Sequence, residues 1–189
     1  FMDHRMWEAQ VAALSPFNKV CCFDMLGHGD SSNPPGNRVL ADFVEQVHQV
    51  IEFLSKYGKP VLGGFSMGGL VSQAYAVQYH SSLRGLILLN TVYQRSASES
   101  TTVERRLEDM VEGGLDSLIK SANDRWFTNS DRDQASRAIE DILGWMREGA
   151  FQPKLKAYPV FARGDKDTAG KLNSISCPCL LYTSDAADE

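Results

Sequence analysis

Three short apolar runs, separated by stretches with helical periodicity, constrain the fold of this chain most strongly. The runs are Lys19–Phe23, Pro60–Gly64 and Leu86–Leu89. Apolar residues recur at helical spacing between the first two runs, and a further helix is expected from about Gly68 to Tyr79. Runs that are apolar throughout are typical of parallel strands buried on both faces. The alternation therefore predicts a parallel α/β sheet flanked by helices.

The pattern changes in the second half of the chain. No strand pattern occurs between Ser98 and about Ile175, whereas apolar residues continue at helical spacing. An insertion between the strands of an open α/β sheet lies near their C-terminal ends, where ligands bind. We therefore expect residues 1–92 to form the first part of a core, residues 93–176 an all-helical lid, and residues 177–189 the start of a returning core strand.

Composition and charge exclude several classes of partner. The net charge is −5 and no basic block occurs, so we expect neither nucleic acid nor a membrane surface as a partner. The four cysteines, Cys21, Cys22, Cys177 and Cys179, have no zinc-type spacing, and we expect no metal. We interpret them as small buried side chains in a reducing compartment, and expect a cytoplasmic protein. Because the chain begins with Phe1 rather than Met, a signal peptide stays an alternative.

One motif carries chemistry. Residues Gly64–Gly68 read GFSMG and match the pattern G-x-S-x-G between a predicted strand and a predicted helix. This pattern places a serine on a strained turn, and glycines two before and two after it let neighbouring backbone pass closely. The context predicts Ser66 as a nucleophile and the backbone N–H of Met67 as an oxyanion donor at the start of a helix.

Several segments resemble the α/β-hydrolase superfamily. Asp24–Ser31 (DMLGHGDS) is similar to its D-x-x-G-x-G-x-S loop, Phe65–Leu70 (FSMGGL) to its nucleophile turn, and Met2–Trp7 (MDHRMW) to the loop after its oxyanion segment. Leu89–Thr91 (LNT) and Arg125–Thr128 (RWFT) resemble the 3-oxoadipate enol-lactonase branch. The resemblance implies a partial α/β-hydrolase fold and cofactor-free hydrolysis of a small carboxylic ester or lactone through an acyl-enzyme at Ser66.

The resemblance also implies a Ser, acid, His order along the chain. The acid is expected after a strand that begins at Cys177, and the His beyond Glu189, so we expect both to be absent and the chain itself to be inactive. Asp185 and Asp188 lie near the expected place of the acid, but we do not assign them that role.

The histidines that are present do not fit the order of the superfamily. All four, His4, His28, His48 and His80, precede the expected lid. His28 is the most tempting because it follows a predicted strand, but the resemblance assigns its position to a structural turn. We therefore assign none of the four as the base.

Weaker candidates remain. Arg125 and Trp126 are candidate substrate-binding residues, because a guanidinium binds a carboxylate bidentately. An ion pair on the lid and a core Trp are an equally open interpretation of the two residues. Asp24 is expected to stabilise its loop by accepting backbone N–H groups rather than to act in catalysis.

The end of the chain has its own pattern. Residues 179–189 (CLLYTSDAADE) read like a translated sequencing adapter, which favours a scar that is excluded from fold reasoning. The alternative is a real strand over Leu180–Thr183.

The functional alternatives are open in two ways. Within enzymes, a carboxylesterase, a C–C-bond hydrolase and an acyltransferase all fit the motif. Outside enzymes, a non-catalytic member of the fold that binds small molecules or proteins fits the resemblance, and so does a truncated product without function of its own.

Overall fold

The computed structural model describes residues 1–183 of the chain. It divides into two compact units. Unit one comprises Phe1–Gly36 and Arg106–Ala157, and unit two comprises Asn37–Arg105 and Tyr158–Glu189.

Unit two contains the sheet. Strands β1 (Val61–Phe65), β2 (Gly85–Leu89) and β3 (Cys179–Tyr182) pair in the order β1-β2-β3. Both pairings are parallel, with Phe65 opposite Leu89 and Leu89 opposite Tyr182. The parallel sheet predicted from the apolar runs is therefore confirmed for the second and third of them.

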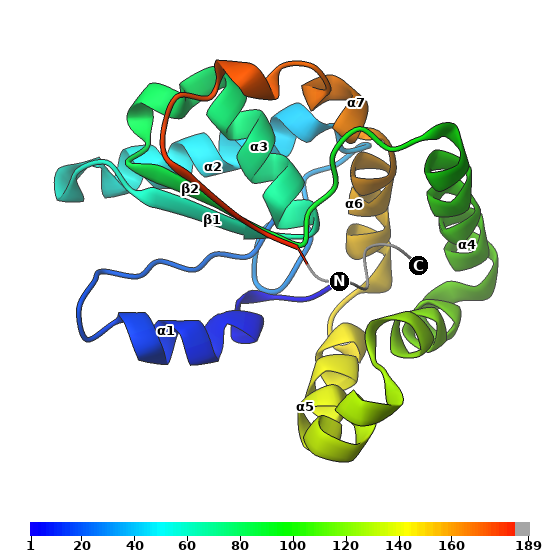
Figure 1. Cartoon of the computed structure of the whole chain (residues 1–189). Helices are drawn as coiled ribbons and strands as arrows, with labels where there is room; N and C mark the ends of the chain where they lie inside the picture. The colour runs from blue at the N-terminus through cyan, green and yellow to red at the C-terminus, as the bar shows by residue number, and fades with distance from the viewer. Residues whose placement is uncertain (184–189) are drawn as a thin grey trace. The chain divides into compact units, whose positions relative to one another are not determined.

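Two helices of unit two build its core on the sheet. Helix α3 (Met67–Tyr79) packs on β1 and β2, and helix α2 (Leu40–Leu54) packs against α3 (Figure 1). The apolar stripe of α2 faces inward because its residues recur at helical spacing. The largest fully buried apolar side chains of this unit are Phe43, Leu70, Tyr75 and Leu86.

Short elements complete unit two. They are the 3₁₀ turns η2 (Ser55–Tyr57), η3 (His80–Ser82) and η4 (Leu172–Ser174) and helix α7 (Asp165–Thr168).

The predicted helical insertion is also confirmed. Helices α4 (Ala97–Trp126), α5 (Asn129–Arg147) and α6 (Phe151–Arg163) fill most of it, and its described residues contain no strand. A positive φ of 68° at Gly114 breaks α4 into two parts. Helix α5 begins with a capping box, in which Thr128 Oγ1 accepts from the N–H of Asp131 at 3.2 Å.

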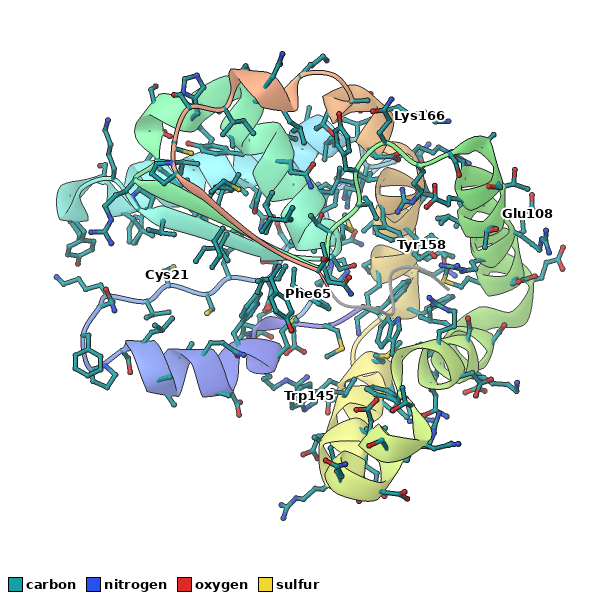
Figure 2. All side chains as sticks on the ribbon, viewed as in Figure 1. Cys21, Phe65, Glu108, Trp145, Tyr158 and Lys166 are labelled. Atoms are coloured by element: carbon teal, nitrogen blue, oxygen red, sulfur yellow. The ribbon has the colours of Figure 1, made fainter. Side chains whose placement is uncertain are left out.

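Unit one begins with the 3₁₀ turn η1 (His4–Trp7) and helix α1 (Glu8–Leu14). The strand predicted at Lys19–Phe23 is wrong, because this segment has no regular structure and its first four residues are exposed. A strand needs a hydrogen-bonded neighbouring strand, and the sheet of the described residues consists of β1, β2 and β3. Cys21 and Cys22 are exposed rather than buried, and Figure 2 shows Cys21 on this extended segment.

No helix among the described residues is both long and apolar enough to cross a membrane.

A buried ion pair holds the chain that follows β2 in unit two. Arg95 Nη1 donates to Asp165 Oδ1 at 2.9 Å, and the backbone N–H of Arg95 donates to Asp165 Oδ2 at 2.8 Å. The same Nη1 donates to the carbonyl of Phe161 at 2.9 Å, and the guanidinium lies 4.5 Å from the centre of the Phe161 ring. Only 6% and 1% of the Arg95 and Asp165 side chains are exposed, so water replaces little of this pairing.

We expect the substitution Asp165→Asn to lower the free energy of unfolding by about 3 kcal/mol, because it leaves a buried guanidinium without its counter-charge. Urea unfolding followed by circular dichroism measures this loss. Glu104→Gln is the matched control, since the Glu104–Arg163 pair is largely exposed and is worth less than about 1 kcal/mol. Equal losses in the two variants would contradict the role of the buried pair.

Candidate functional site

Ser66 lies at the junction between β1 and α3, directly after Phe65, which Figure 2 labels at the end of β1. Its backbone has φ 52° and ψ −116°. A positive φ is uncommon in a residue with a side chain and costs on the order of 1–3 kcal/mol. The strained turn expected from the motif is therefore present at Ser66.

Backbone hydrogen bonds hold Ser66 in this conformation. Its N–H donates to the carbonyl of Leu89 on β2 at 2.9 Å. Its carbonyl accepts from the N–H of Leu70 at 3.1 Å and from the hydroxyl of Thr91 at 3.0 Å. Both ends of the strained residue are thus fixed, one by the neighbouring strand and the other by the helix and the chain after β2.

The glycines of the turn differ in what they make room for. A Cβ on Gly64 would overlap the backbone of Gly68 and Gly69, as the motif predicts. A Cβ on Gly68 would meet nothing within 4 Å, whereas one on Gly69 would lie 2.5 Å from Thr91 Cβ. The prediction that a glycine is needed at position 68 to let neighbouring backbone pass is therefore wrong, because a Cβ there has open space. The other position of the turn without room for a Cβ is Gly69.

The N–H of Met67 opens helix α3. The first N–H groups of a helix have no acceptor within that helix, and the helix dipole makes this end positive. Among the described residues no side chain caps the start of α3, and both Ser66 and Met67 are half-exposed. The start of the helix therefore offers polarised donors directly after Ser66.

Gln73 and Thr91 were not predicted as site residues. Gln73 is 1% exposed and donates from Nε2 to Thr91 Oγ1 at 3.2 Å and to the carbonyl of Val92 at 3.1 Å. The signal that the sequence offered was a glutamine in the largely apolar stretch of α3. Its partner lies 18 residues further along the chain, which periodicity does not indicate.

Arg125 and Trp126 end helix α4 in unit one, whereas Ser66 belongs to unit two. Trp126 is 44% exposed, so the interpretation of a core Trp is wrong. Arg125 is also exposed, and its Nε donates to Ser121 Oγ at 3.3 Å. Their role in substrate binding stays a prediction.

The histidines have other partners. His28 is 3% exposed and its Nδ1 lies 3.2 Å from the carbonyl of Leu26, and burial lowers the pKa of its imidazole to about 3. His48 stacks on Tyr79 with ring centres 4.7 Å apart. The Nδ1 of His80 lies 2.8 Å from Ser176 Oγ. A group with a pKa of about 3 is a weak base at neutral pH, which agrees with a structural role for His28.

Asp24 organises the loop that follows the extended segment. Its carboxylate accepts from the N–H of His4 at 2.6 Å and from the N–H of Asp30 at 3.1 Å, and its own carbonyl accepts from the hydroxyl of Ser31 at 2.5 Å. The loop-stabilising role predicted for Asp24 matches these contacts. The carboxylate also lies 3.1 Å from Nδ1 of His4 and raises the pKa of that imidazole above its ordinary value.

Asp3, His4 and Asp24 bring three ligand-type atoms within 4.8 Å of one another. The oxygens of Asp3 are bound by Nε and Nη2 of Arg5 at 2.9 and 2.6 Å, and those of Asp24 by His4 and Asp30. A cation would have to displace these donors, so we assign no metal to this group.

A cavity of about 420 Å³ lies beside this group in unit one. Two cationic side chains of its lining are bound to Glu148. Arg5 Nη2 lies 2.7 Å from Glu148 Oε2, and Lys154 Nζ donates to the carbonyl of Glu148 at 2.5 Å. Burial lowers the pKa of Lys154.

Two glycine substitutions test the packing of the turn. Gly69→Ala should lower the free energy of unfolding by about 1–3 kcal/mol, because the new methyl group would press on Thr91. Gly68→Ala should raise it by up to about 1 kcal/mol, because Ala favours the helix and space is open there. Urea unfolding of both variants measures the difference, and a destabilised Gly68→Ala beside an unchanged Gly69→Ala would contradict this packing.

The pKa values of His4 and His28 are shifted in opposite directions. The imidazole of His4 should titrate with a pKa above 6.5, because Asp24 stabilises its charged form, whereas His28 should stay neutral from pH 8 down to pH 5. The His4–Asp24 pair thus stabilises the fold below the unfolded pKa, and this contribution is lost as the pH rises through the folded pKa. Proton NMR of the imidazole C–H groups as a function of pH measures the pKa values of both histidines. Asp24→Asn should return the pKa of His4 toward 6.5, and no change would contradict the pairing.

Comparisons with known proteins agree on the family. Residues 1–138 match the family described as alpha/beta hydrolase fold. The chain is 31% identical over 182 residues to (E)-2-((N-methylformamido)methylene)succinate hydrolase of Acinetobacter baylyi, covering 96% of this chain and 67% of that protein. It is 26% identical over 176 residues to 3-oxoadipate enol-lactonase 2 of the same organism, covering 93% and 64%.

Solved structures that resemble this chain include an esterase and an enol-lactonase. A thermophilic esterase from Thermogutta terrifontis with malate bound has a TM-score of 0.79 and 27% identity, covering 95% of this chain and 66% of that one. The enol-lactonase of Burkholderia xenovorans has a TM-score of 0.77 and 25% identity, covering 96% and 68%. The chain thus spans about two thirds of the length of these relatives. With the family match over more than half of its residues, the chain belongs to the α/β-hydrolase fold family.

Proposed function

We propose that the protein to which this chain belongs hydrolyses a small carboxylic ester or lactone through an acyl-enzyme on Ser66. The observation that carries the proposal is the strained backbone of Ser66, with φ 52°, at a strand-to-helix turn. This conformation costs free energy, and such strain is found mainly where function requires it. A non-catalytic binding protein would not need it at this residue.

The reaction proceeds in two steps. A base takes the proton of the Ser66 hydroxyl while Oγ attacks the substrate carbonyl carbon, and the electron pair of the carbonyl moves to its oxygen. The N–H of Met67 and a second backbone N–H stabilise this oxyanion. The C–O bond to the alcohol breaks and the alcohol takes the proton. Water then attacks the acyl-enzyme in the same way, and releases the acid and Ser66.

We place the acid and the base of the triad outside the described residues. His28 is buried with a pKa of about 3, and His4 is paired with Asp24 in its loop. Asp185 and Asp188 lie outside the described residues as well. Without an adjacent base a serine hydroxyl is a poor nucleophile, so the 189-residue chain by itself should be nearly inert.

The substrate class is a small ester or lactone that carries a carboxylate. The names of two relatives refer to a succinate and to an oxoadipate, and a solved relative holds malate. Arg125 is exposed at the end of α4 and would recognise such a carboxylate bidentately, with Trp126 beside it. An acyltransferase or a C–C-bond hydrolase would use the same turn with a different acceptor or a different bond.

The substitution Ser66→Ala in the full-length protein should abolish hydrolysis of a p-nitrophenyl ester, with a loss in kcat of at least about 10³-fold, because no nucleophile remains. Steady-state kinetics measure this loss, and mass spectrometry after an acid quench should find the acyl group on the peptide containing Ser66. Ser81→Ala is the matched control, since Ser81 is exposed after α3. Turnover that survives Ser66→Ala would overturn the proposal.

A further inference from the structure

The Ser66 carbonyl and the Met67 N–H belong to one peptide group. A peptide group is planar and its carbonyl and N–H point in opposite directions, so fixing one fixes the other. The carbonyl of Ser66 accepts from Leu70 N–H at 3.1 Å and from Thr91 Oγ1 at 3.0 Å. The first of these bonds is part of helix α3, whereas the second comes from outside the helix.

Gln73 donates to the Thr91 hydroxyl oxygen and so leaves the hydroxyl proton available for the carbonyl of Ser66. A threonine hydroxyl has a single proton to donate. Because Nε2 of Gln73 donates to Thr91 Oγ1 at 3.2 Å, the hydroxyl proton is left for the carbonyl of Ser66. Nε2 also donates to the carbonyl of Val92 at 3.1 Å, and a flipped amide would bring two oxygens together there. The amide therefore has one favourable orientation.

The amide of Gln73 makes these bonds at a cost. Gln73 is 1% exposed and its Oε1 has no hydrogen-bond partner among the described residues. A buried acceptor without a partner destabilises the fold, so this residue is unfavourable for packing alone. The two donated bonds are what the side chain provides in return.

We propose that Thr91, oriented by Gln73, is a positioning residue that aims the Met67 N–H at the substrate oxyanion. The inference rests on the proposed roles of Ser66 and Met67. The Thr91 hydroxyl restrains the plane of the Ser66–Met67 peptide and polarises it, and a hydrogen bond to a carbonyl strengthens donation from the N–H of the same group. Gly69 makes room for the Thr91 side chain in this arrangement, since a Cβ on Gly69 would lie 2.5 Å from Thr91 Cβ.

The test compares Thr91→Val and Thr91→Ser in the full-length protein. Val keeps the shape of Thr without its hydroxyl, whereas Ser keeps the hydroxyl. Removing an oxyanion donor costs about 10²–10³-fold in kcat, so misaiming one should cost about 10-fold. We expect Thr91→Val to lower kcat by that factor with KM unchanged, and Thr91→Ser to recover most of the loss.

A second readout separates positioning from packing. The affinity for a trifluoromethyl ketone, which forms a tetrahedral adduct with a serine, should fall by the same factor as kcat in Thr91→Val. The affinity for a carboxylate product should not change. If Thr91 had only a structural role, Thr91→Val would lower the temperature of unfolding without this difference between the affinities for the ketone and for the carboxylate product.

Three further variants complete the design. Thr102→Val makes the same chemical change on the exposed part of α4, where the hydroxyl donates to the carbonyl of Ser98, and should leave kcat unchanged. Gln73→Met removes the donor and should lower kcat in the same direction by a smaller factor, so it decides the question if Thr91→Val does not fold. Ser66→Ala tests the proposed function on its own.

The outcomes are distinguishable. Activity that persists in Ser66→Ala overturns the proposed function. If Ser66→Ala is inactive while Thr91→Val and Gln73→Met keep the kcat of the parent protein, only the positioning role is overturned. If Thr91→Val loses kcat and Thr91→Ser does not recover it, the positioning role is overturned as well.

Discussion

The rest of the site depends on the positive φ of Ser66. A residue with a side chain adopts this conformation only when its surroundings hold it there, because the strain is on the order of 1–3 kcal/mol. The hydrogen bonds from Leu70 and Thr91 and the bond to Leu89 offset this cost, at about 1 kcal/mol each. The strained residue is therefore a product of the neighbouring strand as much as of its own turn.

The register of the sheet explains why β2 and the residues after it can hold Ser66 in its strained conformation. Phe65, the last residue of β1, pairs with Leu89, the last residue of β2. Ser66 is the next residue, so its N–H reaches the carbonyl of Leu89. Thr91 follows two residues after Leu89, where its hydroxyl reaches the carbonyl of Ser66. A shift of the register by one residue would turn Leu89 to the other face and separate these groups.

Local patterns in the sequence predicted the parts of the fold that local physics decides. The apolar runs at Pro60–Gly64 and Leu86–Leu89 became β1 and β2, and the helical insertion was also predicted. The run at Lys19–Phe23 is also largely apolar, but it is not a strand of the sheet that the described residues form, and an apolar pattern alone does not supply a partner strand. The roles of Thr91 and Gln73 depend on a contact between residues far apart in the sequence, so the motif identified Ser66 without the groups that hold it.

A His–Asp pair is present in this chain, and it shows why such a pair alone does not define a catalytic site. His4 Nδ1 lies 3.1 Å from the carboxylate of Asp24, the arrangement that orients a base in a hydrolase. The same carboxylate also accepts two backbone N–H groups, from His4 and from Asp30. A Cβ on Gly29, whose φ is 48°, would overlap that carboxylate, so the loop closes tightly around it. The backbone contacts account for Asp24 through the fold alone. In the D-x-x-G-x-G-x-S pattern, Gly29 makes room for its carboxylate and Ser31 donates to its carbonyl, whereas Gly27 makes room for the backbone of Pro153.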